Sequence, residues 1–436
     1  MMSILSPLAS SMFTPGIAQI AKDLDTSTTS VIGTTTGFVV MLGIGPLILA
    51  PLSETFGRRN LYLVCFACFS ILQIPTAVAP NVGFLIAVRS ISGFFGSVGI
   101  ANGGGTISDM FVPDQRAGIF GWYLLGPLLG PTLGPLFGGI IVERLGWRWI
   151  YWFLTIVCFV NTLAGYFFLR ETYAPLILSQ RKARFEHDSQ TQSSDGAKYR
   201  FEGEDARPMR VKLAHSLSRP PKIFAQPIVA TMAVYQALIF GTTYSLYTNF
   251  QDIYGNIYNF NTEQVGLAYL GPGLGFLFAV WFLVPRIDDV YKALAARHHD
   301  NKPMPEYRLP LANIGAVLIP ASLFWFAWAV QMRVHWASSI ASTFFYGVGQ
   351  VVIFNSTQNY YIDSFEQYAA SAIAAGTVFR SLVGGVMPLL APDLFDRLGY
   401  GWGISVFAFV GVALAPAPAI FYWYGEEIRG RFVVKL

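Results

Sequence analysis

Long apolar runs separated by short polar breaks dominate the chain from its first residues to its last. A helix that crosses the hydrocarbon core of a bilayer needs about 20 mainly apolar residues. The runs are apolar on all sides and do not alternate, and backbone amides in lipid must pair within their own segment, so each run is predicted to be an α-helix. Twelve such segments are expected: 1–14, 31–52, 61–79, 84–107, 117–141, 149–169, 225–248, 264–285, 310–331, 337–360, 368–391 and 401–424.

The first segment is the shortest of the twelve. At about 1.5 Å per residue, 1–14 spans about 21 Å, and the hydrocarbon core is about 30 Å thick. We therefore expect the first helix to be truncated. The opening residues have no basic stretch before the apolar run, so no cleavable signal peptide is expected.

The longest polar segment, 170–224, separates the sixth and seventh apolar runs. It holds eleven basic and seven acidic residues, and its polar stretch at 189–194, Ser-Gln-Thr-Gln-Ser-Ser, is typical of disorder. The predicted organisation is a six-helix half at 1–169, a linker loop at 170–224, a second six-helix half at 225–424 and a tail at 425–436.

The basic residues predict the orientation of the chain. If both termini lie in the cytoplasm, the cytoplasmic loops and ends carry 22 Lys and Arg residues and the opposite side carries five. Basic residues gather on the cytoplasmic side of membrane proteins. The termini and the 170–224 linker are therefore expected to be cytoplasmic.

The composition excludes a water-soluble protein. Apolar residues make up 53% of the chain and charged residues only 12%, with a mean hydropathy of +0.48, whereas soluble domains carry about 25% charged residues. The net charge is only +4, and the basic residues form no patch for nucleic acid. Cys65 and Cys68 form a C-x-x-C pair inside an apolar run, which favours packing over a redox or metal site. No catalytic triad, metal cluster or nucleotide loop is present, so neither an enzyme nor a cofactor is expected.

The loop after the second segment carries a charged turn. It reads Leu-Ala-Pro-Leu-Ser-Glu-Thr-Phe-Gly-Arg-Arg and includes Glu54, Gly57, Arg58 and Arg59. Gly57 permits a tight turn, and the arginines can pair with Asp109 at the same end of the fourth segment. This cluster either holds one closed state of the protein or only anchors the loop on the basic side.

The fifth segment carries a stripe of small residues. Its glycines recur every four residues and are followed by prolines; the motif comprises Gly126, Pro127, Gly130, Pro131, Gly134, Pro135, Gly138 and Gly139. Small residues allow a neighbouring helix to approach closely, and proline removes a helical hydrogen bond. A kinked helix pressed against a neighbour is predicted.

Together these features resemble the major facilitator superfamily. The loop LAPLSETFGRR is similar to that family's cytoplasmic loop motif, although Glu54 and Ala50 replace the Asp and Gly of many members. Together with the segments LSPLASSMF and FRSLVGG, this motif makes the sequence most similar to fungal twelve-helix drug:proton antiporters. The resemblance implies two six-helix halves around a central cavity. The fifth-segment motif is associated with antiporters, which implies export in exchange for protons.

Two arginines fall inside predicted segments. An arginine at membrane depth costs about 2.5–3.5 kcal/mol on insertion scales. Arg89 is predicted to face the bundle interior, where the resemblance links it to proton coupling; the alternative is snorkelling to the interface. Arg380, near the middle of the eleventh segment, can pair with a helix carbonyl, line the cavity or bind an anionic group.

Polar-tipped aromatic residues gather in the seventh and tenth segments, which border the cavity in this family. Such side chains suit flat, amphipathic or cationic compounds. The candidates for the substrate cavity are Tyr235, Gln236, Phe240, Tyr244, Phe345, Tyr346 and Asn355.

The predicted function is proton-coupled export of lipophilic or cationic small molecules, such as drugs or a secreted metabolite, by a monomer in the plasma membrane. Its partners are the substrate, protons and the lipid bilayer. All 25 acidic residues lie in loops or at segment ends, so the chemistry of the residues does not identify a proton-carrying group. An uncoupled facilitator or importer, and a receptor that signals through the linker, stay open as alternatives.

Overall fold

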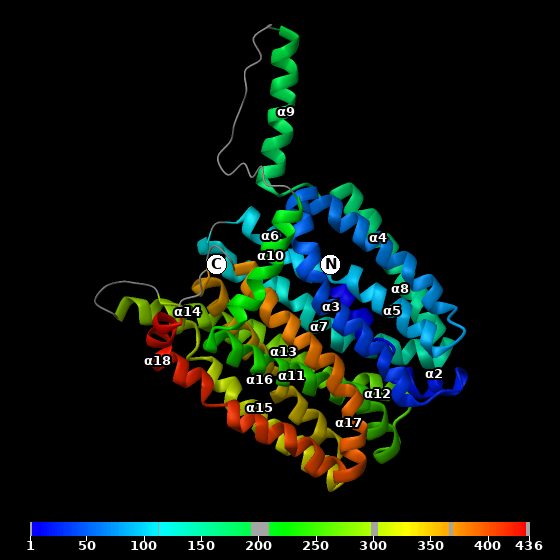
Figure 1. Cartoon of the computed structure of the whole chain (residues 1–436). Helices are drawn as coiled ribbons and strands as arrows, with labels where there is room; N and C mark the ends of the chain where they lie inside the picture. The colour runs from blue at the N-terminus through cyan, green and yellow to red at the C-terminus, as the bar shows by residue number, and fades with distance from the viewer. Residues whose placement is uncertain (1, 112, 193–208, 298–303, 366–368, 433–436) are drawn as a thin grey trace.

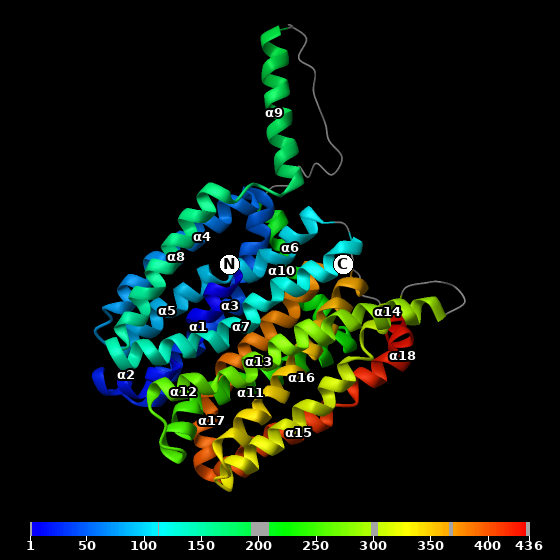
Figure 2. The same cartoon turned by 180° about the vertical axis from the view of Figure 1, so that it is seen from behind.

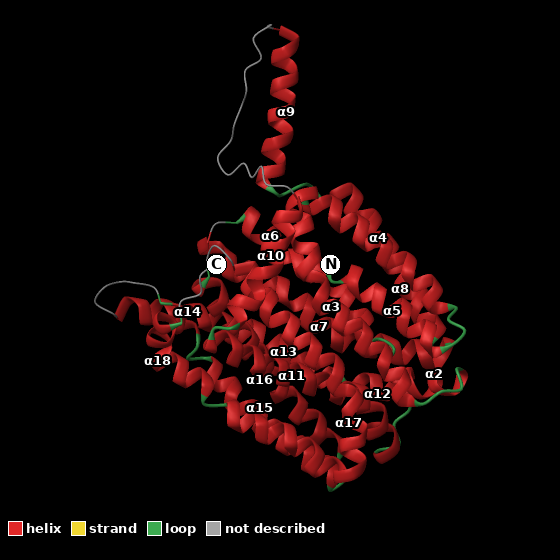
Figure 3. Cartoon of the chain, viewed as in Figure 1, coloured by secondary structure: helices red, strands yellow, loops and turns green. Residues whose placement is uncertain are grey.

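The computed structural model describes residues 2–111, 113–192, 209–297, 304–365 and 369–432. Within these ranges every regular element is a helix, and no strand is found (Figure 3). The predicted fold class, an all-α membrane protein, is confirmed.

The first half of the chain consists of six membrane passes. The first pass is divided into α1, η1 and α2, and the fourth into α5 and α6. The elements are α1 (Met2–Ser11), η1 (Thr14–Gly16), α2 (Ile17–Asp23), α3 (Thr28–Phe56), α4 (Arg58–Ala77), α5 (Val82–Gly96), α6 (Val98–Met110), α7 (Pro113–Leu145) and α8 (Arg148–Phe168).

The first pass is longer than the sequence pattern predicted. Helical structure continues beyond residue 14 through η1 and α2 to Asp23. Pro15 does not end it, because proline at the start of a new turn needs no N–H partner. From Met2 to Asp23 the pass covers about 33 Å at the helical rise, which is enough to cross the core.

The second half again has six passes. Two of its helices contain a π-helical stretch, and α17 contains a break. The elements are α11 (Pro227–Phe250), η2 (Gln251–Ile257), α12 (Thr262–Ala268), α13 (Leu270–Phe278), η3 (Ala279–Leu283), α14 (Val284–Arg297), η4 (Pro305–Arg308), α15 (Ala312–Gln331), α16 (Trp336–Ser364), α17 (Ala369–Leu414) and α18 (Ala417–Arg431).

The helix α17 contains the eleventh pass and the start of the twelfth, and the chain reverses direction at one residue within it. Ten stretches of the described chain are long and apolar enough to cross a membrane, and the tenth, Ala372–Arg431, has 60 residues. At the helical rise it would be about 90 Å long, three times the core. Gly399 divides it, with φ 71° and ψ 167°, a conformation open to glycine. The division at Gly399 and the short α1 together account for the difference between the ten apolar stretches and the twelve passes.

The linker contains more helix than the sequence predicted. It includes α9 (Ala174–Gln192) and α10 (Met209–Phe224), and only part of the polar stretch at 189–194 lies within the described residues. Figure 1 shows α9 projecting away from the bundle, whereas α10 lies against it, in contact with α3 and α17. The end of the bundle that carries α9 is called the linker side below, and the opposite end the far side.

Each half has its own hydrophobic core. One cluster of buried side chains runs from Leu5 to Cys158 and takes only Tyr244 from the second half, and another runs from Tyr235 to Ala408. The halves, blue to cyan and green to red in Figures 1 and 2, meet mainly where α3 packs on α17 and where α7 packs on α12 and α13. The predicted arrangement of two six-helix halves is therefore observed.

Large apolar side chains cover the outside of the bundle. Exposed examples occur on passes of both halves: Ile71, Ile156, Phe159, Phe167, Trp281, Val317, Phe409 and Trp423. An apolar exterior of this extent suits lipid and not water.

We predict that Gly138→Ala destabilises the bundle. A Cβ atom at Gly138 would overlap the carbonyl oxygen of Met12, and such overpacking costs about 1–3 kcal/mol, against a gain of about 1 kcal/mol from helix propensity. Thermal denaturation in detergent measures the effect. Gly411→Ala is the control, because its Cβ would meet nothing closer than 3.7 Å. A Gly138→Ala protein as stable as wild type would contradict the prediction.

Candidate functional site

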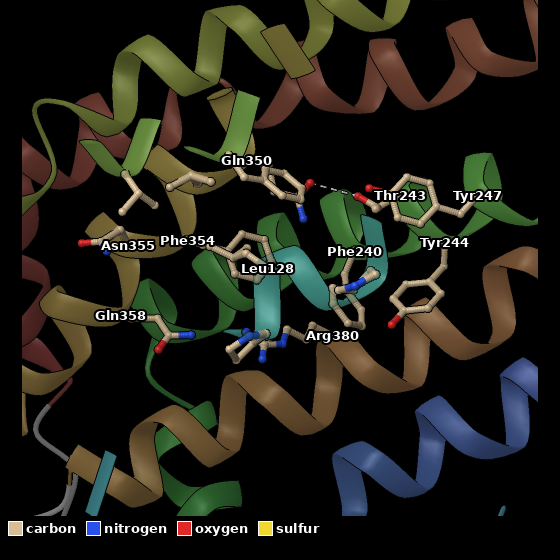
Figure 4. Close-up of a pocket in the computed structure, with 15 residues that line it drawn as sticks. Leu128, Phe240, Thr243, Tyr244, Tyr247, Gln350, Phe354, Asn355, Gln358 and Arg380 are labelled. Carbon is tan, nitrogen blue, oxygen red and sulfur yellow. Dashed lines mark hydrogen bonds between the residues drawn. The ribbon is translucent and has the colours of Figure 1, made fainter. Parts of the chain in front are cut away.

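A small cavity lies between the two halves, with α7 of the first half and helices of the second half around it. It encloses about 60 Å³, which is room for a few water molecules, so a drug-sized substrate requires the walls to move apart. Residues of α7, α11, α13, η3, α16 and α17 line it: Pro127, Leu128, Pro131, Phe240, Thr243, Tyr244, Tyr247, Phe276, Val280, Gln350, Val351, Phe354, Asn355, Gln358 and Arg380 (Figure 4).

The cavity wall combines aromatic rings with neutral polar groups. The Phe240 and Phe354 rings lie 6.5 Å apart between centroids. The Thr243 hydroxyl donates a hydrogen bond to the Gln350 amide oxygen at 3.3 Å. The Tyr244 hydroxyl is hydrogen-bonded to Ser10 of α1 at 2.8 Å. The wall can therefore contact the apolar part of a ligand and form hydrogen bonds with the ligand's polar edge.

Three of the seven residues predicted to line the cavity do so, namely Phe240, Tyr244 and Asn355. These three residues come from α11 and α16, the two helices on which the candidates were predicted. The glutamines at 350 and 358 and the aromatic residue at 354 also line the wall; their i, i+4 and i+8 spacing places them on one face of α16, a signal present in the sequence.

The other four predicted residues are buried elsewhere or face outward. Tyr235 is fully buried in the core of the second half, and Gln236 is turned toward α17 near Gly376. The Tyr346 hydroxyl donates to the carbonyl of Ile239 at 2.9 Å, within the bundle. None of these three residues lines the cavity in this conformation, because packing between α11, α16 and α17 takes their side chains.

Phe345 points away from the cavity. Its side chain is 42% exposed, and its ring lies 5.9 Å from that of Trp325 on the outside of the bundle. Because successive helical residues are about 100° apart around the axis, Phe345 cannot share a face with the cavity-lining residues of α16. Its assignment to the cavity is therefore corrected.

The small-residue stripe of α7 faces two different neighbours. The glycines at 126, 130, 134 and 138 lie against α1 and the turn after it: Cβ atoms there would meet Ser3, Pro7, Ser11 and Met12. The next residue, Gly139, lies against α12 instead, where a Cβ would be 2.7 Å from the Thr262 carbonyl oxygen. The prolines at 127 and 131 line the cavity, and the Pro135 carbonyl faces Gly266 of α12.

Contacts between the halves close the far side of the cavity. The Thr14 hydroxyl is hydrogen-bonded to that of Tyr269 at 3.2 Å. Near the surface, Arg144 of α7 forms an ion pair with Glu263 of α12 at 3.4 Å. Both pairs join residues distant in sequence, so only the tertiary structure brings them together.

Arg89 is enclosed within the first half. Its side chain is 1% exposed, which excludes snorkelling, and its Nη2 donates to the carbonyl of Ala9 at 3.1 Å. The guanidinium carbon lies 4.5 Å, 4.9 Å and 5.6 Å from the ring centroids of Phe13, Phe38 and Tyr151. The protein itself therefore supplies the partners of this charge.

Arg380 has a different environment. It lies on α17 and lines the cavity (Figure 4). Its guanidinium carbon lies 5.4 Å and 5.2 Å from the ring centroids of Phe240 and Phe354. Within the described part of the chain it has no hydrogen bond or ion pair; its Nε, like that of Arg89, is enclosed without a partner.

The predicted pairing at the charged turn of the first half is present for one of the two arginines. Arg58 Nε donates to Asp109 at 3.2 Å, and its Nη1 donates to Ser53 at 2.5 Å. These residues belong to α3, α4 and α6, so the cluster ties three helices of one half. Glu54 lies in α3, and its side chain is outside the described residues.

Arg59 does not join that cluster. Its Nε donates to the carbonyl of Leu169 at 2.8 Å and its Nη2 to the carbonyl of Tyr166 at 3.0 Å. Carbonyls at a helix C-terminus lack intrahelical partners, and a cation there also opposes the negative end of the helix dipole. Arg59 therefore joins the start of α4 to the end of α8.

Glu171 completes this corner and was missed from the sequence. Its carboxylate accepts hydrogen bonds from the backbone N–H groups of Arg58, at 3.0 Å, and Arg59, at 3.1 Å. It caps the N-terminus of α4 from 113 residues away in sequence, so no local motif reveals it. Gly57, with φ 92°, is packed against the same carboxylate.

The second half has a comparable charged cluster on its linker side, also missed from the sequence. Arg308 forms ion pairs with Asp363, at 2.8 Å, and with Asp288. Burial opposes the charge, but Asp363 and Asp288 outweigh it and raise the pKa of Arg308. Nearby, burial raises the pKa of Glu306, partly offset by Arg429, with which it pairs at 3.4 Å.

The cysteines and acidic groups show no metal chemistry in the described part of the chain. Cys65, Cys68 and Cys158 are free, and no group of three His, Cys, Asp or Glu residues there could hold a metal ion.

Comparisons with known proteins place this architecture among membrane carriers. A family model described as Major Facilitator Superfamily matches residues 1–388. The chain is 38% identical to the MFS-type transporter tndD of Aspergillus flavipes, over 99% of this chain and 80% of that protein. It is also 38% identical to the efflux pump radE of Floropilus chiversii, over 100% and 80%. The solved structure of a D-xylose-proton symporter has the same fold, with a TM-score of 0.68 and 15% identity over 97% and 95% of the two chains.

We predict that Gly57→Ala destabilises the protein more than Gly146→Ala. Both glycines have a positive φ, 92° and 88°, so alanine is strained at either. Only at Gly57 would the Cβ overlap Glu171, whereas nothing lies within 4 Å at Gly146. The excess loss, about 1–3 kcal/mol, is measured by thermal denaturation of the two variants. Equal losses would show that Glu171 can move aside.

Proposed function

Because this chain belongs to the major facilitator superfamily, we propose that it exports lipophilic small molecules, drugs or a secreted metabolite, in exchange for protons. It is a multi-pass membrane transporter and not an enzyme. We further propose that it works as a monomer in the plasma membrane, with the termini and the linker side in the cytoplasm.

The separate cores of the two halves support a rocking mechanism. Each half holds its own cluster of buried side chains, so the halves can move as bodies while the contacts between them change. In the present conformation the far side is closed by α7 on α12 and by the Thr14–Tyr269 hydrogen bond. Opening those contacts while the linker side closes would carry a substrate across.

The cavity supports a lipophilic substrate. Phe240, Phe354 and Phe276 supply apolar surface, and amide and hydroxyl groups supply hydrogen bonds. A cationic substrate, the other expectation from the sequence, is not favoured, because the single formal charge among the fifteen lining residues is that of Arg380. The printed name of the relative radE, an efflux pump, supports the outward direction.

The proposed proton coupling centres on Arg89. Its charge contacts α1, α3 and α8 at once, through Ala9, Phe13, Phe38 and Tyr151. A change in the protonation of a neighbouring group would alter the packing of these three helices together. The α7 stripe, which the resemblance associates with antiporters, lies on the same α1.

An uncoupled facilitator or importer is the second candidate. One observation favours it: none of the fifteen cavity-lining residues is acidic, and many proton-coupled carriers use an intramembrane carboxylate. In that case substrate would move only down its own gradient.

We predict that a pH gradient drives transport by the purified protein in vesicles. The probes are naphthalene-2-sulfonate and 2-naphthyltrimethylammonium, whose permanent charges prevent leakage in a neutral form. With the lumen acidic and the membrane potential clamped, at least one probe is expected to accumulate, and a protonophore is expected to abolish accumulation. Movement at the same rate without the gradient would leave the transporter but remove antiport. No movement of either probe would contradict the proposed substrate class.

We also predict that Arg89→Lys separates coupling from transport. Lysine keeps the charge but loses the planar group that contacts three rings. Gradient-driven accumulation is expected to fall at least about fivefold, while exchange of probe at equal pH on both sides continues. Arg431→Lys, at an exposed ion pair with Glu427 within α18, is the control. Equal loss of both activities would assign Arg89 to folding or to the transport path itself.

A further inference from the structure

The two arginines inside the membrane passes differ in what surrounds them. Arg89 donates a hydrogen bond to Ala9 and contacts three aromatic rings. Arg380 contacts two rings, and within the described residues it forms neither a hydrogen bond nor an ion pair. Arg380 is therefore a charge in the membrane interior whose donors the protein leaves unused.

This arrangement is energetically costly without a partner. A guanidinium group has five N–H donors in a planar fork, and contact with aromatic faces satisfies none of them. Desolvating a charge without a partner is unfavourable. The rings of Phe240 and Phe354 cover the guanidinium but are not hydrogen-bond acceptors of ordinary strength. The missing component is an acceptor, and an anion satisfies both the charge and the hydrogen-bond donors.

We propose that Arg380 is the anion-binding residue of the central cavity, and that the substrate is an organic anion with an apolar or aromatic body. This inference rests on the proposed function as an exporter and specifies its substrate class. The carboxylate, sulfonate or phosphate group binds the Arg380 fork. The body lies against Phe240 and Phe354, and Asn355 and Gln358 on α16 offer neutral hydrogen-bonding groups.

The same charge selects against cations. None of the fifteen described lining residues is acidic, so a cationic substrate would meet Arg380 without compensation in a medium of low dielectric constant. For an organic anion, a membrane potential that is negative inside itself favours outward movement. An anion exporter therefore needs no carboxylate in its cavity, as observed.

Ligand binding in detergent tests the proposal without requiring transport. The probes are naphthalene-2-sulfonate, its neutral analogue naphthalene-2-sulfonamide, and 2-naphthyltrimethylammonium, each measured by the rise in Tm with concentration. Wild type is expected to bind the sulfonate at least about tenfold more tightly than the sulfonamide, and the cation most weakly. Equal binding of sulfonate and sulfonamide, or no binding of the sulfonate, would overturn the proposal.

Variants at residue 380 assign the preference to this side chain. Arg380→Met is expected to remove the difference between sulfonate and sulfonamide, and Arg380→Lys to retain part of it, because lysine keeps the charge but not the fork. Sodium sulfate distinguishes an inorganic anion: it is expected to protect less than the naphthalene sulfonate. Preference for sulfonate that survives in Arg380→Met, or equal protection by sulfate, would contradict the assignment.

The stability of the ligand-free variants distinguishes a binding role from a structural one. Removing an unpartnered, partly buried charge relieves its desolvation, so Arg380→Met is expected to have a Tm equal to or above that of wild type. The matched control is Arg89→Met, which removes a partnered charge and is expected to lower the Tm. A lower Tm for Arg380→Met would show that the protein itself uses this charge, and would overturn the proposal.

The two levels of the proposal fail separately. Arg380-dependent binding of the sulfonate together with gradient-independent transport would remove proton antiport and retain the anion site. Proton-driven transport of the cation without sulfonate binding would retain antiport and remove the anion site.

Discussion

Close backbone contact along α7 is the interaction on which the arrangement of the bundle depends. In lipid, apolar side chains gain little from associating with one another, so helices are held by close packing and by the hydrogen bonds it permits. The glycines of α7 allow α1 to approach along four turns, and Gly139 allows α12 of the other half to approach at the far side. One helix thus belongs to the core of one half and forms part of the contact between halves. Two of its prolines, Pro127 and Pro131, line the cavity.

The two arginines inside the bundle differ in role, one in the structure of a half and the other in ligand binding. Arg89 has its partners within the first half, where α1, α3 and α8 surround it. Arg380 faces the cavity formed where the two halves meet, and within the described residues it has ring contacts but no hydrogen bond or ion pair. Because a membrane interior offers no counter-charge to an unpaired guanidinium, the difference in partners separates a residue that the fold uses from one left for a ligand.

The linker side repeats one device in both halves. Arg58 joins Asp109, and Arg308 joins Asp288 and Asp363. In each case an arginine at the basic side of the membrane ties the ends of several helices within a half. The charged turn of the first half also depends on Glu171, whose carboxylate caps α4. These contacts stiffen each half separately and leave the surfaces between halves free to change.

The sequence by itself indicated about a dozen passes, because the length of an apolar run that crosses the membrane follows directly from the thickness of the bilayer. The long polar segment between the sixth and seventh runs indicated the two halves, and the family resemblance indicated the helices that border the cavity. The sequence also indicated the packing of α7, since glycine spacing is a local pattern. Only the tertiary structure decided the extension of the first pass to Asp23, the outward position of Phe345 and the capping by Glu171. The contrast between Arg89 and Arg380 also needed it. These depend on which distant segments meet, and a residue's partners in a packed bundle are not encoded in its neighbours along the chain.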